Sequence, residues 1–384
     1  MANTLTDLAG DIYVAADVVS RELVGLIPAS TINGGAERAA KDDTVRSHVT
    51  AAAAAVNNTP SMTIPEGTDQ TVTNKTMTLS KSKSVQIPWT GEDIRHVDNG
   101  SGFQTIYGDQ IAQAMRTLTN EMEADLGVAC RAAASRAYGT AGTTPFGTAN
   151  DYTDGSNVLK ILKDNGAGGL DNQLVINTSA GANFLGKQSA VNAAGTDSML
   201  RQGVLLDLAG MPIRESAQLA SHTAGTGASA TTDATGYAVG ATTITLASAG
   251  TGTILTGDAI TFAGDSEKYM VVTGDADVSG GGSIVIKAPG LQKAIPAAAT
   301  AITVSASSAT NIAFARSALE LAVRAPAMPS GGDAAVDRMM VTDPRSGISF
   351  DIAMYKGFQK AMIAVGAVWG VKAWKDEHIA LMLG

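Results

Sequence analysis

The chain has 384 residues, of which 45% are hydrophobic, so it is long enough for two or three folded domains, and wholesale disorder is excluded. Its 27 basic and 36 acidic residues give a formal net charge of −9. This charge disfavours tight, sequence-independent binding to nucleic acid, because such binding depends on lysine and arginine neutralising phosphates. Enclosing nucleic acid without binding it tightly is compatible with the charge.

The single cysteine and the first residues bear on the compartment. Cys130 has no partner for a disulfide within the chain, which fits a reducing environment. The opening residues lack the basic and apolar arrangement of a secretory signal, and no apolar run approaches the ~20 residues that cross a bilayer. We therefore expect a protein that is made in the cytoplasm and has no membrane partner.

Two periodicities occur in the first hundred residues. Apolar side chains recur at near-helical spacing from Ala9 to Leu26 and predict an N-terminal helical arm. From Met77 to Trp89 the period is two, which predicts a strand. One face of this strand carries apolar side chains with two lysines among them: Met77, Leu79, Lys81, Lys83, Val85, Ile87 and Trp89.

The pattern leaves two interpretations of this strand open. With the extended stretch before it, the strand forms a long two-stranded excursion, and two strands alone are only marginally stable in water, so the excursion needs a partner. In the alternative interpretation it is an ordinary strand that packs on its own domain.

The strongest helical pattern runs from Tyr107 to about Tyr138, where apolar residues recur every three or four positions. A continuous helix of this length would be on the order of 45 Å long, which suits a structural spine. We expect its charged residues to lie mostly in solvent: Arg116, Glu121, Glu123, Asp125, Arg131 and Arg136.

The middle of the chain has an α/β pattern that is interrupted. Helical stretches at Ser156–Lys163 and from Ala180 flank a strand pattern at Gln173–Asn177. A Gly/Thr/Ala-rich block from Gly225 to Ser308 follows, which indicates a β-domain inserted into a host domain. Short β-branched runs bounded by Gly, Asp or Pro predict its strands, at Thr242–Leu246, Asp258–Phe262, Tyr269–Val272 and Ser283–Ile286.

The host pattern resumes after the inserted block. Residues Asn311 to Arg324 are compatible with a helix. Two β-type runs follow at Ile348–Tyr355 and Ala361–Trp374, and then a short apolar stretch at His378–Leu383.

One stretch imitates a phosphate-binding loop but lacks a required group. Gly181 to Gln188 matches the pattern GxxxxGK[ST] except at its last position, where Gln188 replaces the hydroxyl that would bind Mg²⁺. Bulky Phe184 and Leu185 also stand where the backbone would have to wrap around phosphates. We favour a plain strand, turn and helix here, and we expect no cofactor.

No catalytic or metal site is expected either. The four histidines are widely separated, the GxSxG pattern of a serine nucleophile is absent, and Cys130 lies in the predicted long helix, where packing is the simpler role. Asp275 and Asp277 lack the other ligands of a calcium loop, so a solvated hairpin tip is the simpler interpretation.

Several segments, taken in order, resemble a known family. They are the opening Met1-Ala-Asn-Thr-Leu, the segments Thr256-Gly-Asp-Ala-Ile-Thr-Phe-Ala-Gly and Ile286-Lys-Ala-Pro-Gly-Leu in the inserted block, and Asn311-Ile-Ala-Phe-Ala-Arg-Ser-Ala-Leu-Glu-Leu-Ala after it. With the long helix and the β-rich last part, the chain resembles the major capsid (coat) proteins of tailed bacteriophages. Specifically, it looks like the podovirus coat subgroup that carries an inserted β-domain in a Hong Kong 97-type fold.

The resemblance implies an α+β fold with a defined division of the chain. The implied parts are an N-terminal arm (1–58), an extended loop (59–104), the spine helix of a peripheral domain (105–141), a first part of an axial domain (142–224), an inserted all-β domain (225–308), a second part of the axial domain (309–340) and a C-terminal β-rich part of the peripheral domain (341–384).

The resemblance also implies a function without enzymatic activity. Such a protein self-assembles as pentamers and hexamers into the icosahedral head of a tailed phage and encloses double-stranded DNA without sequence-specific binding. The implied partners are further copies of the chain, a scaffolding protein, a portal protein and a decoration protein. The implied location is the virion capsid, which is assembled in the cytoplasm of the bacterial host.

The resemblance makes two segments candidates for contacts between subunits. In the extended loop, the apolar residues Met77, Leu79, Val85, Ile87 and Trp89 would bury a face on a neighbouring subunit, and Lys81 and Lys83 would pair with acidic groups there. In the inserted domain, the candidate is the loop from Gly274 to Gly282 with Asp275 and Asp277.

Two functions of other classes stay open at this point. One is a surface protein whose inserted β block binds a carbohydrate or a receptor. The other is a nucleotide-dependent enzyme that acts through the segment Gly181 to Gln188.

Overall fold

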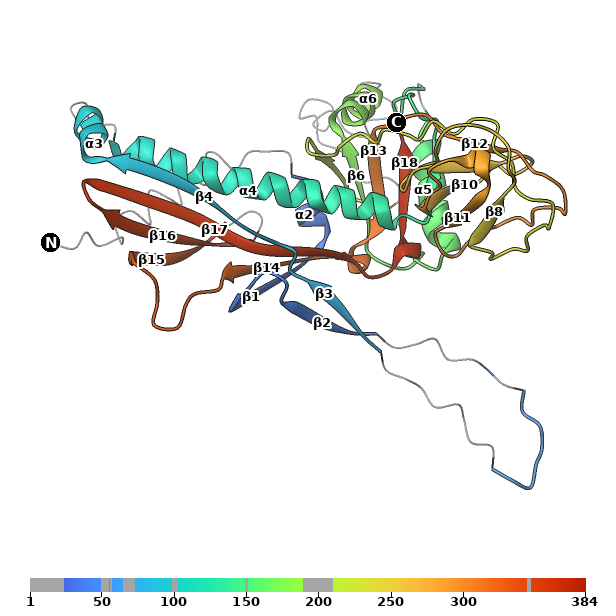
Figure 1. Ribbon diagram of the computed structural model, residues 1–384, viewed down its shortest axis with the longest axis horizontal. Helices are drawn as coiled ribbons and strands as arrows, with labels where there is room; N and C mark the ends of the chain where they lie inside the picture. Colours follow the sequence, from blue (N-terminus) through green and yellow to red (C-terminus); the bar gives the residue numbers. More distant parts are fainter. Residues whose placement is uncertain are drawn as a thin grey trace.

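The computed structural model describes residues 24–49, 55, 57–64, 73–98, 103–148, 151–188, 210–343 and 347–384. The molecule is elongated, with a long sheet under one helix on one side and a second sheet and a β-rich lobe on the other (Figure 1). The helical arm predicted at Ala9 to Leu26 falls outside the described residues except for its last three. A short helix, α2 (Leu26–Ala29), follows there.

Six of the described strands form the long sheet. Five of them are paired in the order β1-β14-β17-β16-β15. The sixth, β4, also pairs with β17 and lies outside this order. The strands are β1 (Thr31–Ala39), β4 (Lys81–Thr90), β14 (Leu319–Pro326), β15 (Ala335–Thr342), β16 (Ser349–Gly357) and β17 (Lys360–Ala373).

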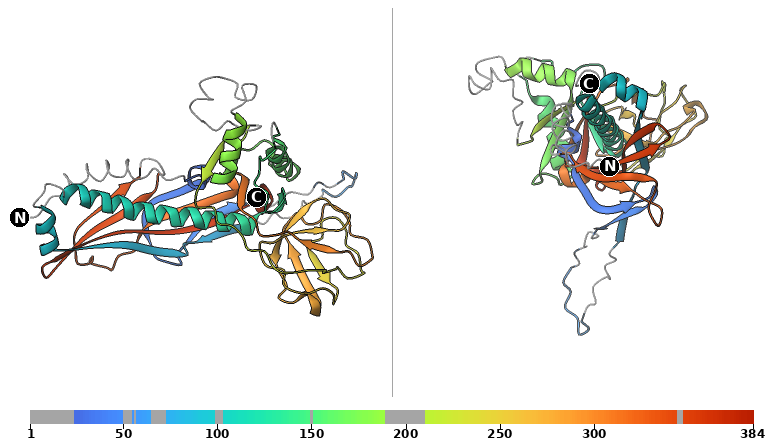
Figure 2. Two further views of the ribbon diagram at one scale, coloured as in Figure 1. Left: turned by 90° about the horizontal axis from the view of Figure 1, so that it is seen from above. Right: turned by 90° about the vertical axis from the view of Figure 1, so that its left-hand side faces the viewer.

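Helix α4 (Phe103–Ala133) runs along the long sheet as the predicted spine (Figures 1 and 2). Its 31 residues correspond to on the order of 46 Å. The helix ends five residues earlier than predicted, because the chain turns into strand β5 (Arg136–Tyr138). A short helix, α3 (Gly91–Asp98), leads into it from β4.

The second sheet joins the host fold to the inserted block. Its order is β12-β9-β10-β5-β18-β13-β6-β7, and β11 pairs with β10 and β8. The strands from the host are β5, β6 (Asn172–Asn177), β7 (Ile213–Ser216), β13 (Thr310–Ala315) and β18 (Ile379–Leu383). Helix α5 (Thr153–Asp164) packs on β5, β13 and β18, and helix α6 (Thr178–Gln188) packs on β6 and β7.

The strand predictions for the inserted block are confirmed. The strands are β8 (Thr243–Leu246), β9 (Ala259–Phe262), β10 (Lys268–Thr273), β11 (Gly282–Ile286) and β12 (Ile302–Val304). They enclose a core of their own that includes Ile244, Ile260 and Ile284. The block is nevertheless continuous with the host, because β10 pairs with β5 through Tyr269 and Arg136.

The helix predicted at Asn311 to Arg324 is wrong. This segment forms the two strands β13 and β14, joined by a single turn at Arg316–Ala318. Strand β13 is buried on both faces, so its last four residues, Ile312 to Ala315, are all apolar and lack the alternation that marks a strand with one exposed face.

Strand pairing divides the chain differently from the predicted boundaries. Strands β14 and β15 belong to the long sheet, although they fall within or next to the predicted second axial part, 309–340. Strand β18 lies in the second sheet between β13 and β5, although it falls within the predicted peripheral part, 341–384. The chain therefore changes sheets at Arg316–Ala318 and again between β17 and β18.

A two-stranded ribbon projects from the long sheet. It consists of β2 (Thr44–Val49) and β3 (Thr73–Thr78), which pair in an antiparallel register. Residues 57–64 lie farther out, well away from the rest of the molecule in Figure 1 and in the right-hand view of Figure 2. The ribbon thus begins within the predicted N-terminal arm, 1–58, and it ends before β4, which is a member of the long sheet.

Candidate assembly surfaces

The apolar face of the segment from Met77 to Trp89 is covered within the chain. Met77 and Leu79 are buried against Ala322 and Val368. Trp89 is 9% exposed, and its indole N–H donates to Gln110 Oε1 at 2.9 Å. These contacts correct the prediction that this face is buried on a neighbouring subunit.

Val85 and Ile87 complete this face and are partly buried against the main core. The strand that contains them, β4, pairs with β17 along its whole length, from Lys81 opposite Trp369 to Thr90 opposite Lys360. For residues 81–90, the interpretation as a strand packed on its own domain is therefore the right one.

The two lysines of this segment find their acidic partners on helix α4 of the same chain. Lys81 Nζ lies 3.0 Å from Glu121 Oε1 and 2.8 Å from Asp125 Oδ1, and Lys83 also pairs with Glu121. The hydrogen bond to Asp125 raises the pKa of Lys81. Partial burial raises the pKa of Glu121, but the bonds from Lys83 and Lys81 outweigh it and hold that pKa below its ordinary value. Within the subunit, both lysines thus have acidic partners on α4, and the predicted partners on a neighbouring subunit stay a prediction.

Glu123 is a buried anchor that sequence analysis placed in solvent. Its side chain is fully buried and accepts three backbone N–H groups, from Gly25 at 2.8 Å, Leu26 at 2.6 Å and Ile27 at 2.9 Å. Burial raises the pKa of Glu123, and the hydrogen bonds from these N–H groups oppose that rise. Glu123 therefore holds the backbone of residues 25–27 against α4.

Two buried arginines attach the inserted block to the host, and sequence analysis placed both in solvent. Arg131, at the end of α4, donates to Thr310 Oγ1 at 2.9 Å and to the Gly257 carbonyl at 3.2 Å. Burial lowers its pKa to about 10. Arg136 is 2% exposed and pairs with Glu267 at 3.0 Å. The partners lie more than 120 residues away in the sequence, so no local pattern could reveal them.

The entrance and exit of the inserted block are tied together. His222 and Ser308 form an antiparallel bridge. His222 Nε2 lies 2.7 Å from Asp258 Oδ1, and this fully buried carboxylate also accepts the backbone N–H groups of Gly225 and Leu255. The two segments that connect the block to the host, at His222 and at Ser308, are therefore held together by hydrogen bonds; we call this connection the neck of the block.

The candidate loop from Gly274 to Gly282 is a compact turn between β10 and β11. Asp275 accepts the backbone N–H of Asp277 at 2.8 Å, and Asp277 accepts the N–H and the hydroxyl of Ser279 at 3.1 and 2.6 Å. The bonds from Ser279 hold the pKa of Asp277 below its usual range. Val278, which follows Asp277, is fully buried and anchors the loop to the core of the inserted block, while Asp277 itself is exposed.

The segment Gly181 to Gln188 lies within helix α6 and forms no loop around a phosphate site. A Cβ atom on Gly181 would lie 1.5 Å from Glu215 Oε1, so this glycine allows a close approach between helix and neighbouring strand. Cys130 is fully buried, and burial raises the pKa of its thiol. Among the described residues, no three His, Cys, Asp or Glu side chains gather as a metal site would require.

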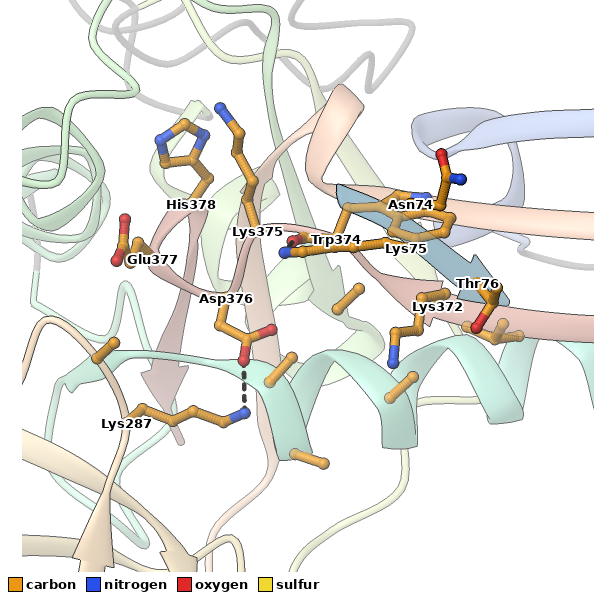
Figure 3. A pocket seen from close by; sticks show the side chains of 16 residues that line it. Asn74, Lys75, Thr76, Lys287, Lys372, Trp374, Lys375, Asp376, Glu377 and His378 are labelled. Carbon is orange, nitrogen blue, oxygen red and sulfur yellow. Dashed lines mark hydrogen bonds and ion pairs between the residues drawn. The ribbon is translucent and has the colours of Figure 1, made fainter. Parts of the chain in front are cut away.

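A cavity of ≈ 860 Å³ opens where four parts of the molecule meet (Figure 3). Its walls come from β3, the last turns of α4, the inserted block, and the end of β17 with the segment that follows it. Lysines line it: Lys75, Lys287, Lys372 and Lys375. Lys287 pairs with Asp376 at 2.6 Å, and Lys75 donates to the Trp374 carbonyl at 3.1 Å.

None of the described helices is long and apolar enough to cross a membrane.

No family model matches the sequence, and no curated protein matches it. Among solved structures, the capsid of Cyanophage P-SCSP1u is similar at 10% sequence identity, covering 92% of this chain and 86% of that chain with a TM-score of 0.50. The capsid asymmetric unit of Cyanophage A-1(L) is 10% identical, covers 96% of this chain and 92% of that chain, and has a TM-score of 0.47. A chain of Mycobacterium phage Che8 is 13% identical, with coverages of 89% and 85% and a TM-score of 0.43.

The likeness to the P-SCSP1u capsid extends over nearly the whole of both chains. The chain therefore has the α+β, Hong Kong 97-type fold of tailed-bacteriophage capsid proteins.

Proposed function

We propose that this protein is the major capsid protein of a tailed bacteriophage and that it self-assembles as pentamers and hexamers into an icosahedral head around double-stranded DNA. The observation that carries the proposal is the likeness of fold to a phage capsid subunit over 92% of the chain. The net charge of −9 suits a container wall that encloses DNA without sequence-specific binding.

The projecting loop supports an assembling protein. Met62 and Ile64 are 105% and 89% exposed, on a segment that extends far from the fold that carries it. Exposed apolar side chains that lie close together on a projecting segment offer a surface that a partner can cover. A neighbouring subunit is the partner that a shell provides, because each copy meets further copies through repeated heterologous contacts that close into rings.

The candidate contact residues divide into two groups on this proposal. Met77, Leu79, Val85, Ile87 and Trp89 serve the fold of the subunit itself. Lys83, whose side chain is 49% exposed, and the exposed loop with Asp275 and Asp277 remain accessible to a neighbouring subunit, and we propose them as contacts.

The proposal includes partners and a place of assembly. Besides further copies of itself, the subunit would meet a scaffolding protein, a portal protein and a decoration protein. Assembly would take place in the cytoplasm of the bacterial host, and the product would be the virion capsid.

Negative-stain electron microscopy tests the proposal. The purified protein is imaged after concentration alone, and again after co-expression with the product of any neighbouring scaffold-like gene. Closed shells, rings of five or six subunits, or aberrant spirals are the expected results. Uniform monomers under both conditions would contradict the proposal.

A further inference from the structure

The lysine-lined cavity holds positive charge that the described part of the subunit does not pair. Of the lysines in its walls, Lys287 is compensated by Asp376 at 2.6 Å. Among the described residues, the ammonium group of Lys75 bonds to a neutral carbonyl, that of Trp374, and to no carboxylate. Lys372 is exposed, points toward α4 in Figure 3, and has no ion pair within 4.0 Å among the described residues.

Two neighbouring carboxylates, those of Glu320 and Glu377, do not form an ion pair with Lys372. Glu320 stands opposite Lys372 in the register of β14 and β17, but its two oxygens accept hydrogen bonds from Asn33 and Trp374. The side chain of Glu377 is directed away from Lys372 in Figure 3.

The part of the cavity wall that α4 supplies carries no negative charge, and its small side chains leave space in the cavity. It presents only the methyl groups of Ala129, Ala132 and Ala133. The cavity of ≈ 860 Å³ is large enough for several side chains of a peptide segment. A concave, positively charged site of this size is complementary to a segment that carries carboxylates.

We infer that this cavity is an intersubunit socket in which Lys75 and Lys372 receive a carboxylate-bearing segment of a second copy of the chain. The chain carries 36 acidic and only 27 basic residues, so every copy offers surplus carboxylates to its neighbours. In a ring of identical subunits, unlike surfaces of adjacent copies must meet, and complementary charge fixes their register. The inference rests on the proposed function, because only an assembling subunit has such a neighbour.

Carbodiimide cross-linking of shells tests the socket directly. Shells are assembled from an equal mixture of heavy-nitrogen-labelled and unlabelled subunits without added scaffold or nucleic acid, treated with the carbodiimide, digested and analysed by mass spectrometry. The expected products join Lys75 or Lys372 to an Asp or Glu peptide, with one labelled and one unlabelled partner. Intact shells in which these lysines form only links within one copy, or none, would overturn the inference.

Charge reversal gives a second measurement. The variant Lys75→Glu/Lys372→Glu is expected to assemble at least about tenfold more slowly than the unaltered protein, because like charges would then meet in the socket. Its urea unfolding midpoint should stay unchanged. Lys356→Glu is the matched control, because Lys356 is exposed on β16 and lies outside the cavity.

Other roles for the two lysines would give different results. If the lysines only compensate the end of α4, the double variant would lower the stability of the subunit and leave the assembly rate of its folded fraction equal to that of the control. If shells form only with a scaffolding protein and the lysines link to that protein, the occupant is not a second copy. If the unaltered protein stays uniformly monomeric, both alone and with a scaffolding protein, the proposed function itself fails.

Discussion

Lys81 Nζ lies 2.8 Å from Asp125 Oδ1, and the other oxygen of this carboxylate accepts the indole N–H of Trp369 at 2.9 Å. One side chain of α4 therefore holds two neighbouring strands of the long sheet, β4 through Lys81 and β17 through Trp369. The ammonium group of Lys81 also lies 6.0 Å from the centre of the Trp369 ring. The spine helix and the sheet are joined by charge as well as by apolar packing.

Reversing both lysine charges should destabilise the isolated subunit. In the variant Lys81→Glu/Lys83→Glu, two new carboxylates would face Glu121 and Asp125, and we expect the free energy of unfolding to fall by about 1–2 kcal/mol. Urea unfolding of the monomer measures the change, with Lys356→Glu as control. A variant as stable as the control would show that these pairs contribute nothing to the fold of the subunit.

The ion pairs of Glu121 with Lys81 and Lys83 should make the free energy of unfolding depend on pH in the acidic range. Since the folded-state pKa of Glu121 lies below its ordinary 4.5, its stabilising contribution is present above that pH and is lost as the pH falls through the folded-state pKa. The difference in unfolding free energy between the unaltered protein and Glu121→Gln should therefore shrink between about pH 6 and pH 3. A difference that stays constant over this range would contradict the prediction.

Replacing Glu123 by glutamine should loosen the segment around Gly25. The amide would turn an N–H group toward backbone N–H donors, so at least one donor loses its acceptor in a buried place, at a cost of about 1–3 kcal/mol. Hydrogen exchange at the Leu26 and Ile27 amides should accelerate. Glu92→Gln, on the exposed helix α3, is the control and should change neither quantity.

Arg131→Met should weaken the attachment of the inserted block. Methionine replaces the apolar stem of arginine but has no hydrogen-bond donor. The Gly257 carbonyl and the Thr310 hydroxyl therefore lose their buried donor, and the free energy of unfolding should fall by about 2–4 kcal/mol. Limited proteolysis should then cut the neck of the block, near His222 and Ser308, faster than in the unaltered protein. Equal cleavage in Arg131→Met and in Arg46→Met, which alters an exposed arginine of β2, would contradict this assignment.

Local sequence signals predicted the inserted block well. Its strands are short and β-branched, and Gly, Asp and Pro mark the turns between them, so neighbouring residues carry the information. The spine helix could be predicted equally well, because the residues from Ile111 to Leu126 keep one apolar face against the sheet along several turns.

The failures have a common physical cause, which is the dependence on partners distant in sequence. Strand β13 owes its conformation to β6 and β18, which bury it from both sides, and its alanines alone favour a helix. Glu123 and Arg131 look like ordinary solvated charges until residues 25–27 and 257 are brought against them. The lysine cavity has the same origin, since its walls come from four separate parts of the chain.

The position of β18 sets the order of events during synthesis. Residues 379–383 are at most 1% exposed and fill the gap between β13 and β5, so the two halves of the second sheet stay unjoined until this strand has left the ribosome. By then the spine helix, the ribbon and the inserted block have all been translated. On the proposed function, a nascent chain can therefore present its completed second sheet to another copy only after β18 has been translated.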